Sequence, residues 1–307
     1  MSIVERAADK LRQTSPQATQ RPLPIQPADS DEQPRAAFGD HIEAAGRRQS
    51  HQQEQAEPRS KLMIDFTKLH RAGLVPPASA EKLVAREYQR IKRPLISNAT
   101  GVNGVDVANG NRFMVASALS GEGKTFTSFN LALSLAKERD YSVLLVDGDV
   151  IKPSISRALG LEKAQGLTDI LADDTLSFSN TVFETNVPRL SVLPAGQYQD
   201  SATELLASRR MAWFMGELSR DPNRMIIFDS PPLLATAESQ AMAMAVGQIL
   251  LVVKAGKTPR DAVEAALSLV SAADKSISLI LNQSTKAHGD YYAGYYGGYY
   301  DGQSARA

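Results

Sequence analysis

The chain has 307 residues, 43% of them hydrophobic, which allows a globular core in one large or two small domains. Lys plus Arg and Asp plus Glu number 34 each, so the net charge is zero and gives no argument for binding nucleic acid or an anionic membrane. The absence of Cys excludes disulfides and thiolate chemistry and fits a reducing compartment.

The first segment, residues 1–58, is rich in Gln, Pro, Ser, Ala and charged residues. Its six prolines break any long helix, and it has too little apolar surface to offset the entropy of ordering. It also lacks the apolar core of a secretory signal. We therefore expect a disordered leader, and no run in the chain approaches the ~20 apolar residues of a membrane-spanning helix.

Residues 59–285 have the composition of a folded domain. Apolar side chains just after the leader are expected to pack on its core: Leu62, Ile64, Phe66 and Leu69. A helix is predicted over Ala80–Lys92, ending because of Pro94.

From Arg112 onward, apolar runs alternate with helical patterns. The predicted strands are Arg112–Ser117, Val143–Asp147, Leu190–Leu193, Met225–Asp229, Ile249–Val253 and Ile277–Leu281. The predicted helices are Lys124–Lys137, Thr203–Arg220, Ala237–Val246 and Pro259–Ala273. Continuously apolar strands are typical of parallel strands covered on both faces. The pattern predicts an α/β fold with a doubly wound, mostly parallel sheet and helices on both faces.

A phosphate-binding loop (P-loop) is predicted at Ala118–Thr125, between a strand and a helix. Gly121 and Gly123 let backbone N–H groups converge on phosphate, Lys124 reaches the β- and γ-phosphates, and Thr125 ligates Mg²⁺. The strict motif has Gly where this chain has Ala118. The predicted ligand is ATP with Mg²⁺, and the nucleotide-binding residues are Ser120, Gly121, Glu122, Gly123, Lys124, Thr125 and Phe126.

Three carboxylates at strand ends fit the same site. Asp147 closes one strand, with Asp149 two residues after it, and Asp229 closes another; ligands of such sheets bind beyond the carboxyl ends of the strands. Mg²⁺ prefers oxygen ligands, so we expect Thr125 and Asp149 to hold it, with Asp229 acting through water. Asp147 is expected to orient or deprotonate an attacking hydroxyl. Taken singly, each Asp could instead be an ordinary turn or cap residue.

The last segment, residues 286–307, contains six of the nine tyrosines, separated by Gly and Ala. No hydrophobic period supports a core element here, so we expect a flexible tail. The alternative is an aggregation-prone, low-complexity aromatic segment with no role in a reaction.

The P-loop, the Asp-x-Asp strand end and the Asp-Ser-Pro-Pro strand end together resemble the bacterial tyrosine kinases of exopolysaccharide synthesis. The resemblance covers roughly Lys82 to Gln283 and the tail. The subgroup linked to exosortase and PEP-CTERM loci is similar at Asp147–Ser154, Gly166–Leu171, Ala202–Ser208 and Phe228–Ala235.

The resemblance implies an ATP-dependent tyrosine autokinase that phosphorylates its own tail in trans. It implies catalytic roles for Lys124, Asp147, Asp149 and Asp229, and contact of Asn282 with the base. The implied acceptors are Tyr291, Tyr292, Tyr295, Tyr296, Tyr299 and Tyr300.

Glu87, Arg90 and Arg93 match the family's Glu-x-x-Arg-x-x-Arg element, which implies assembly into a ring. Their spacing of three places them on one face of a helix. The alternative is a solvated face with no partner. The chain departs from the family at Ile151, where Arg is usual; Lys152 could take that role.

The resemblance also implies partners and a location. These are a separate membrane-embedded regulator of polysaccharide chain length as activator, a tyrosine phosphatase, and a cytoplasmic position peripheral to the inner membrane. The implied role is to regulate exopolysaccharide biosynthesis, polymerisation and export.

Two rivals remain open. One is a non-kinase ATPase switch of the partition or division-site type, disfavoured because those proteins carry a second lysine at the position of Leu119. The other is a scaffold whose tail only binds partners.

Overall fold

The computed structural model describes residues 61–102, 104, 107–271 and 275–284. The predicted leader and the predicted tyrosine tail therefore lie outside the described residues. Among the described helices, none combines the length and apolar character needed to cross a bilayer.

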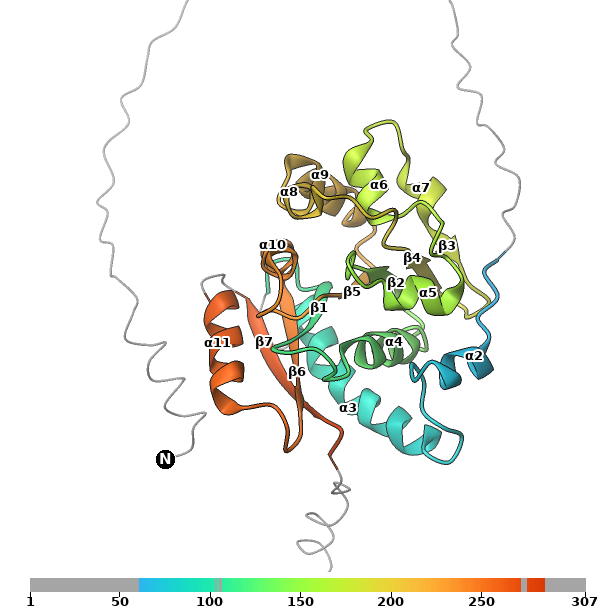
Figure 1. The fold of residues 1–307 in the computed structure, drawn as a ribbon. Helices are drawn as coiled ribbons and strands as arrows, with labels where there is room; N and C mark the ends of the chain where they lie inside the picture. Colours follow the sequence, from blue (N-terminus) through green and yellow to red (C-terminus); the bar gives the residue numbers. More distant parts are fainter. Residues whose placement is uncertain (1–60, 103, 105–106, 272–274, 285–307) are drawn as a thin grey trace, which may run out of the picture. The chain divides into compact units, whose positions relative to one another are not determined.

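A seven-stranded sheet forms the centre of the fold (Figure 1). Its strand order is β3-β4-β2-β5-β1-β6-β7, and every neighbouring pair is parallel except β3 and β4. The strands are β1 (Arg112–Ser117), β2 (Ser142–Asp147), β3 (Phe183–Glu184), β4 (Leu190–Leu193), β5 (Arg224–Asp229), β6 (Gln248–Lys254) and β7 (Ser276–Asn282). The six predicted strands are confirmed; the short antiparallel edge strand β3 was not predicted.

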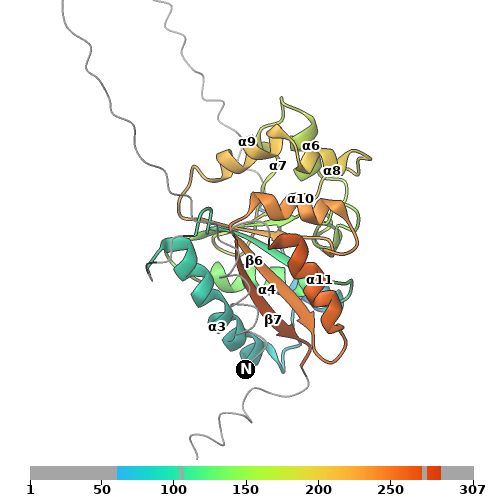
Figure 2. The same ribbon diagram turned by 90° about the vertical axis from the view of Figure 1, so that its left-hand side faces the viewer.

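Helices cover both faces of the sheet (Figure 2). They are α2 (Phe66–Arg71), α3 (Glu81–Thr100), α4 (Lys124–Leu135), α5 (Ser154–Leu159), α6 (Leu167–Ala172), α7 (Phe178–Thr181), α8 (Ala202–Leu206), α9 (Arg209–Leu218), α10 (Ala237–Ala245) and α11 (Arg260–Val270). One core layer joins the sheet to α2–α5, and the other joins it to α6 and α8–α11. Successive residues of β1 alternate between the two layers: Phe113 enters the first and Met114 the second. The predicted doubly wound α/β fold is confirmed.

The predicted end of the helix before Pro94 is wrong, because α3 continues to Thr100. Proline removes one helical hydrogen bond, but tertiary contacts hold α3 on both sides of it. Before Pro94, the Lys92 ammonium donates to the carbonyl of Ser134 at 2.7 Å. After it, Leu95 is buried and its carbonyl accepts from the side chain of Gln248 at 2.9 Å.

The predicted single helix over Thr203–Arg220 is in fact two helices, α8 and α9. The break falls at Ser208, whose side chain caps α9 by accepting from the N–H of Met211. The expected burial of Phe66 is also wrong, since 46% of it is exposed, whereas Ile64 and Leu69 are buried as predicted.

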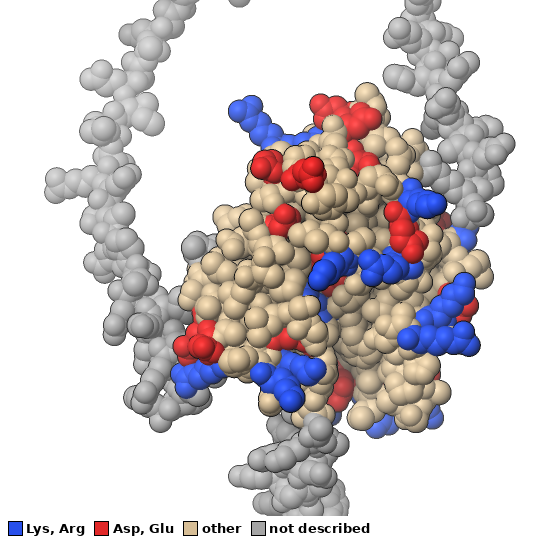
Figure 3. Space-filling view, viewed as in Figure 1, with Lys and Arg blue, Asp and Glu red and all other residues tan. Residues whose placement is uncertain are grey.

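Charged side chains of both signs are interspersed over the face shown in Figure 3. This mixture matches the equal numbers of acidic and basic residues in the whole sequence. That face therefore offers no broad surface of a single charge.

Candidate functional site

The P-loop joins β1 to α4, as predicted. Gly121 and Gly123 have φ of 78° and 95°, a backbone conformation that residues other than glycine rarely adopt. Gly123 is also the N-cap of α4. Ala118 does not have a positive φ, so its Cβ brings no backbone strain. This explains how Ala can stand at a position where the strict motif has Gly.

Lys124 opens α4 and is almost fully buried, at 7% exposure. Burial lowers the pKa of its ammonium, and the nearby carboxylates, led by Asp229 and Asp149, oppose that shift. A lysine ammonium at the N-terminus of a helix is suited to holding phosphate.

Asp147 and Asp229 are direct neighbours across the paired strands β2 and β5, and neither is exposed. Burial, and then the charge of Asp229, raise the pKa of Asp147 to about 7 against the opposing hydrogen bonds from Ser156. Burial raises the pKa of Asp229 to about 6. Two acids with raised pKa values in one closed site are characteristic of a functional centre.

Each of these two carboxylates has one bound and one unbound oxygen. Oδ2 of Asp147 accepts from the backbone N–H and the hydroxyl of Ser156, both at 2.7 Å. Oδ1 of Asp229 accepts from the hydroxyl of Ser128 at 2.9 Å. Oδ1 of Asp147 and Oδ2 of Asp229 are buried without a hydrogen-bond partner. Unpaired buried carboxylate oxygens are costly, and they are suitable sites for a cation or for a donating hydroxyl.

Asp149 is half-buried and accepts from the backbone N–H of Lys152 at 3.0 Å. Burial raises its pKa, and the hydrogen bond to Lys152 and the charge of Lys124 oppose the rise. The Thr125 hydroxyl lies close enough to Asp229 to lower the pKa of that acid.

The hydroxyl of Thr125 and the carboxylates of Asp149 and Asp229 are oxygen donors of the kind that Mg²⁺ prefers. No group of three or more acids and histidines suitable for a metal occurs among the described residues. A cation held by Thr125, Asp149 and Asp229 would therefore need phosphate and water oxygens to complete its coordination.

Gly148 fixes the acidic turn against β5. Its N–H donates to the carbonyl of Asp229 at 2.8 Å. A Cβ at this position would lie 2.7 Å from that carbonyl and 2.5 Å from the terminal methyl of Met242. Only glycine allows this approach, which holds Asp147 and Asp149 beside Asp229.

The other predicted nucleotide-binding residues lie within the loop or beside it. Ser120 and Gly121 are exposed, whereas Glu122 is 2% exposed and turns its side chain inward. Phe126 packs its ring toward Tyr88 of α3, with centroids 6.5 Å apart. Asn282, at the end of β7, donates its side-chain amide to the carbonyl of Glu122 at 2.9 Å. The structure thus brings Asn282 to the P-loop from more than 150 residues away in sequence.

The predicted assembly residues Glu87, Arg90 and Arg93 lie on α3 and are exposed. Arg90 and Arg93 line a shallow hollow of about 360 Å³ together with Arg86 and Gln89. Within the described part of the chain, none of these charged groups has an ion pair in which the oppositely charged atoms lie within 4 Å. The predicted phosphorylation sites, Tyr291 to Tyr300, lie outside the described residues.

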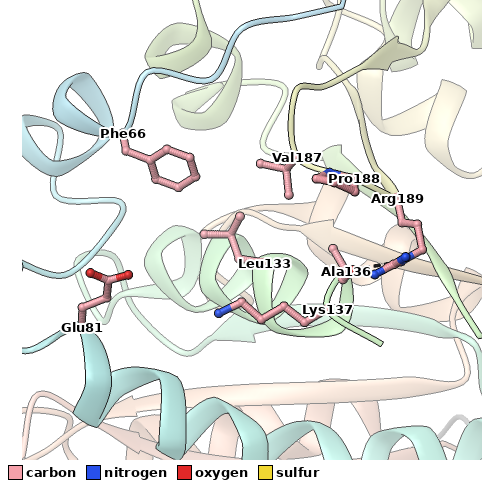
Figure 4. Close-up of a pocket in the computed structure, with 8 residues that line it drawn as sticks. All are labelled: Phe66, Glu81, Leu133, Ala136, Lys137, Val187, Pro188 and Arg189. Atoms are coloured by element: carbon pink, nitrogen blue, oxygen red, sulfur yellow. Dashed lines mark hydrogen bonds between the residues drawn. The ribbon is translucent and has the colours of Figure 1, made fainter. Parts of the chain in front are cut away.

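A second hollow, of about 480 Å³, lies at the far end of α4 from the P-loop (Figure 4). It is lined by Phe66, Glu81, Leu133, Ala136, Lys137, Val187, Pro188 and Arg189. Leu133 follows Lys124 by nine residues on α4, so the two are about 14 Å apart along the helix axis. This hollow is therefore separate from the predicted site.

Sequence reasoning missed three side chains that support the site: Ser128, Ser156 and Thr258. Ser128 lies four residues after Lys124, so the helical period could have placed the two residues on one face of α4. Ser156 is on the unpredicted helix α5, and no local signal linked it to Asp147. Thr258 donates its hydroxyl to Glu122 from a distant loop, which no sequence pattern indicates.

Comparison with known proteins gives one consistent result. The chain matches the family model described as "AAA domain" over residues 113–283, more than half of its length. It is 36% identical over 180 residues to tyrosine-protein kinase YwqD of Bacillus subtilis (strain 168), covering 58% of this chain and 75% of that one. It is 35% identical over 186 residues to tyrosine-protein kinase CpsD of Streptococcus agalactiae, covering 58% and 78%.

The fold agrees with a solved kinase domain as well. The VpsO kinase domain aligns with a TM-score of 0.56 and 31% sequence identity, covering 68% of this chain and 100% of that one. The matched regions contain the P-loop and the strand ends that carry the acids.

Proposed function

The chain belongs to the bacterial tyrosine-protein kinases, and on that basis we propose that it transfers the γ-phosphoryl group of ATP to tyrosines of its own C-terminal segment. The observation that best supports this proposal is the pair Asp147 and Asp229, buried side by side with raised pKa values next to Lys124. A site of this kind can hold phosphate and also accept a proton from a hydroxyl.

The proposed reaction forms one bond and breaks another. The tyrosine oxygen bonds to the γ-phosphorus as the bond from that phosphorus to the β–γ bridging oxygen breaks, and ADP leaves with the electron pair. The hydroxyl proton passes late to the unpaired Oδ1 of Asp147, because a free tyrosine has a pKa of about 10 and stays protonated at neutral pH. A carboxylate with a pKa of about 7 is well matched to that task.

Each other side chain has a positioning or electrostatic role in this scheme. Lys124 and the loop amides would hold the β- and γ-phosphates, and Thr125 and Asp149, with Asp229 through water, would hold Mg²⁺. The metal would neutralise charge on the phosphates during transfer. Since Asp147 is not exposed, the turn at Gly148 and Asp149 must open, or a water must bridge, before tyrosine reaches it.

The finer parts of the proposal concern assembly and location. The exposed Glu87, Arg90 and Arg93 would join subunits in a ring, so that one subunit phosphorylates the segment of the next, Tyr291 to Tyr300. Such tethering raises the effective concentration of the substrate. A separate membrane-embedded activator, a tyrosine phosphatase and a cytoplasmic position at the inner membrane complete the proposal. The relatives are named as tyrosine-protein kinases. For this chain we further propose a role in regulating exopolysaccharide production.

Incubation with ATP and Mg²⁺ followed by phosphosite mapping tests the function. Lys124→Met should abolish phosphotyrosine, and Phe in place of all six tyrosines of residues 291–300 should remove most of the label. Tyr198, which is 66% exposed, is an internal control for unselective labelling. Label on Tyr198 rather than on residues 291–300, or phosphate released only to water, would contradict the proposal; the second outcome would favour the ATPase switch.

A further inference from the structure

Glu122 lies within the P-loop, but its carboxylate points into the protein. Its Oε2 accepts from the backbone N–H of Leu119 at 2.9 Å, and its Oε1 accepts from the hydroxyl of Thr258. Only 2% of the residue is exposed. Because both oxygens already have donors inside the protein, this carboxylate is not free to contact phosphate or solvent.

Thr258 connects the loop to a distant part of the chain. Its hydroxyl oxygen accepts from the N–H of Lys254 at 2.9 Å, and its own N–H donates to the carbonyl of Lys254 at 3.1 Å. The β6–α11 loop is therefore closed upon itself, and the hydroxyl proton of Thr258 is directed to Glu122. Pro259, the N-cap of α11, follows immediately.

The end of β7 completes a closed set of contacts. The Asn282 side chain donates to the carbonyl of Glu122 at 2.9 Å, and the carbonyl of Asn282 accepts from the N–H of Ala255 at 2.9 Å. A Cβ at Gly123 would lie 2.1 Å from the Asn282 amide nitrogen, so the glycine also makes room for this approach. Glu122 thus contacts both the β6–α11 loop, through Thr258, and the end of β7, through Asn282.

We propose that Glu122 and Thr258 are positioning residues that keep the P-loop in its phosphate-binding conformation and lock it to the β6–α11 loop. The proposal rests on the proposed nucleotide chemistry of this site. With the Leu119 N–H bound to Glu122, the loop from Leu119 to Glu122 is closed before any ligand arrives. Two donors also hold the negative charge of Glu122 away from the phosphate side, where a free carboxylate would repel the triphosphate.

Preorganisation predicts a particular kinetic pattern. Losing the Thr258 hydroxyl leaves one oxygen of a buried carboxylate without a donor, and hydrogen bonds to charged groups are among the stronger ones. The loop must then be ordered when nucleotide binds. We expect weaker binding of ATP with little change in the transfer step itself.

The test uses the full chain with Thr258→Val, Thr258→Ser and Glu122→Gln. The dissociation constant for ATP–Mg²⁺ should rise about tenfold in Thr258→Val and in Glu122→Gln, and Thr258→Ser should restore it. The kcat for tail phosphorylation should change less than the KM for ATP. Thr203→Val is the matched control, because the Thr203 hydroxyl donates to another carboxylate, Glu238, at 2.6 Å between α8 and α10. It should leave ATP binding unchanged.

Three results would overturn the inference. One is wild-type ATP affinity in Thr258→Val. Another is an equal loss in the Thr203→Val control. The third is failure of Thr258→Ser to recover binding while its melting temperature stays at the wild-type value. If the wild-type chain binds ATP but labels no tyrosine, the proposed function fails, whereas weaker ATP binding in Thr258→Val would still support this inference.

Discussion

Replacing Asp147 by Asn should stabilise the nucleotide-free protein at pH 8 while removing the group that we propose accepts the tyrosine proton. In the folded state Asp147 has a pKa of about 7, against an ordinary 3.8. The raised pKa means that folding favours the protonated acid. Its contribution to stability is therefore complete below pH 3.8 and is lost as the pH rises to about 7. Asn carries no charge, and its amide oxygen can still accept both hydrogen bonds from Ser156.

The expected magnitude follows from that shift. About 3 pKa units correspond to about 4 kcal/mol at 1.36 kcal/mol per unit. The new NH₂ group gains no certain partner, which costs about 1–3 kcal/mol. A net stabilisation on the order of 1–3 kcal/mol is expected at pH 8. Between pH 5 and pH 7 the wild type loses about 1.36 kcal/mol of unfolding free energy per pH unit. The difference in unfolding free energy between Asp147→Asn and wild type should therefore widen by about 3 kcal/mol over this range.

Urea denaturation followed by circular dichroism at pH 5 and pH 8, with chelator and no nucleotide, measures this difference. The exposed Asp200→Asn provides the same change of charge as a control and should show no such dependence. If the difference in unfolding free energy between Asp147→Asn and wild type is the same at both pH values, the reasoning about Asp147 is refuted.

Three further predictions concern the same domain. Arg90→Glu should reduce the oligomer fraction measured by light scattering, whereas Arg71→Glu, which changes an exposed arginine on α2, should not. Equal effects of the two variants would argue against a subunit contact through Glu87, Arg90 and Arg93 of α3. The kcat/KM for tail phosphorylation should rise with pH through about 7 as Asp147 loses its proton, and a flat profile from pH 6 to pH 8 would exclude it as the base. Gly148→Ala should lower stability by about 1–3 kcal/mol because of the contacts its Cβ would make. Gly216→Ala in α9, where a Cβ meets nothing within 4 Å, should raise stability by up to about 1 kcal/mol. The melting temperature should therefore fall in Gly148→Ala and rise in Gly216→Ala.

The strands and the P-loop were predictable because their signals are local. Parallel strands covered on both faces must be apolar throughout, and the two glycines with Lys124 need only a strand before them and a helix after them. The acids at strand ends followed from topology, since the carboxyl ends of parallel strands meet at one edge.

What could not be predicted depends on contacts between distant segments. Proline predicts a helix end, but α3 continues past Pro94 because Lys92 and Leu95 are held by other elements. The side chains that orient the carboxylates are equally non-local: Ser156 is on a six-residue helix with little periodicity to detect. Thr258 reaches Glu122 across 136 residues of sequence.

The pairing of β2 with β5 has a consequence for motion. Asp147 and Asp229 are the last of six aligned residue pairs, so the distance between their backbones is set by the spacing of neighbouring strands, about 4.8 Å. This distance does not depend on the conformation of the loops around the site. Backbone amides of these two buried strands should be among the last to exchange with deuterated solvent. The two acids would therefore keep their separation through every cycle of nucleotide entry and release that leaves the sheet intact.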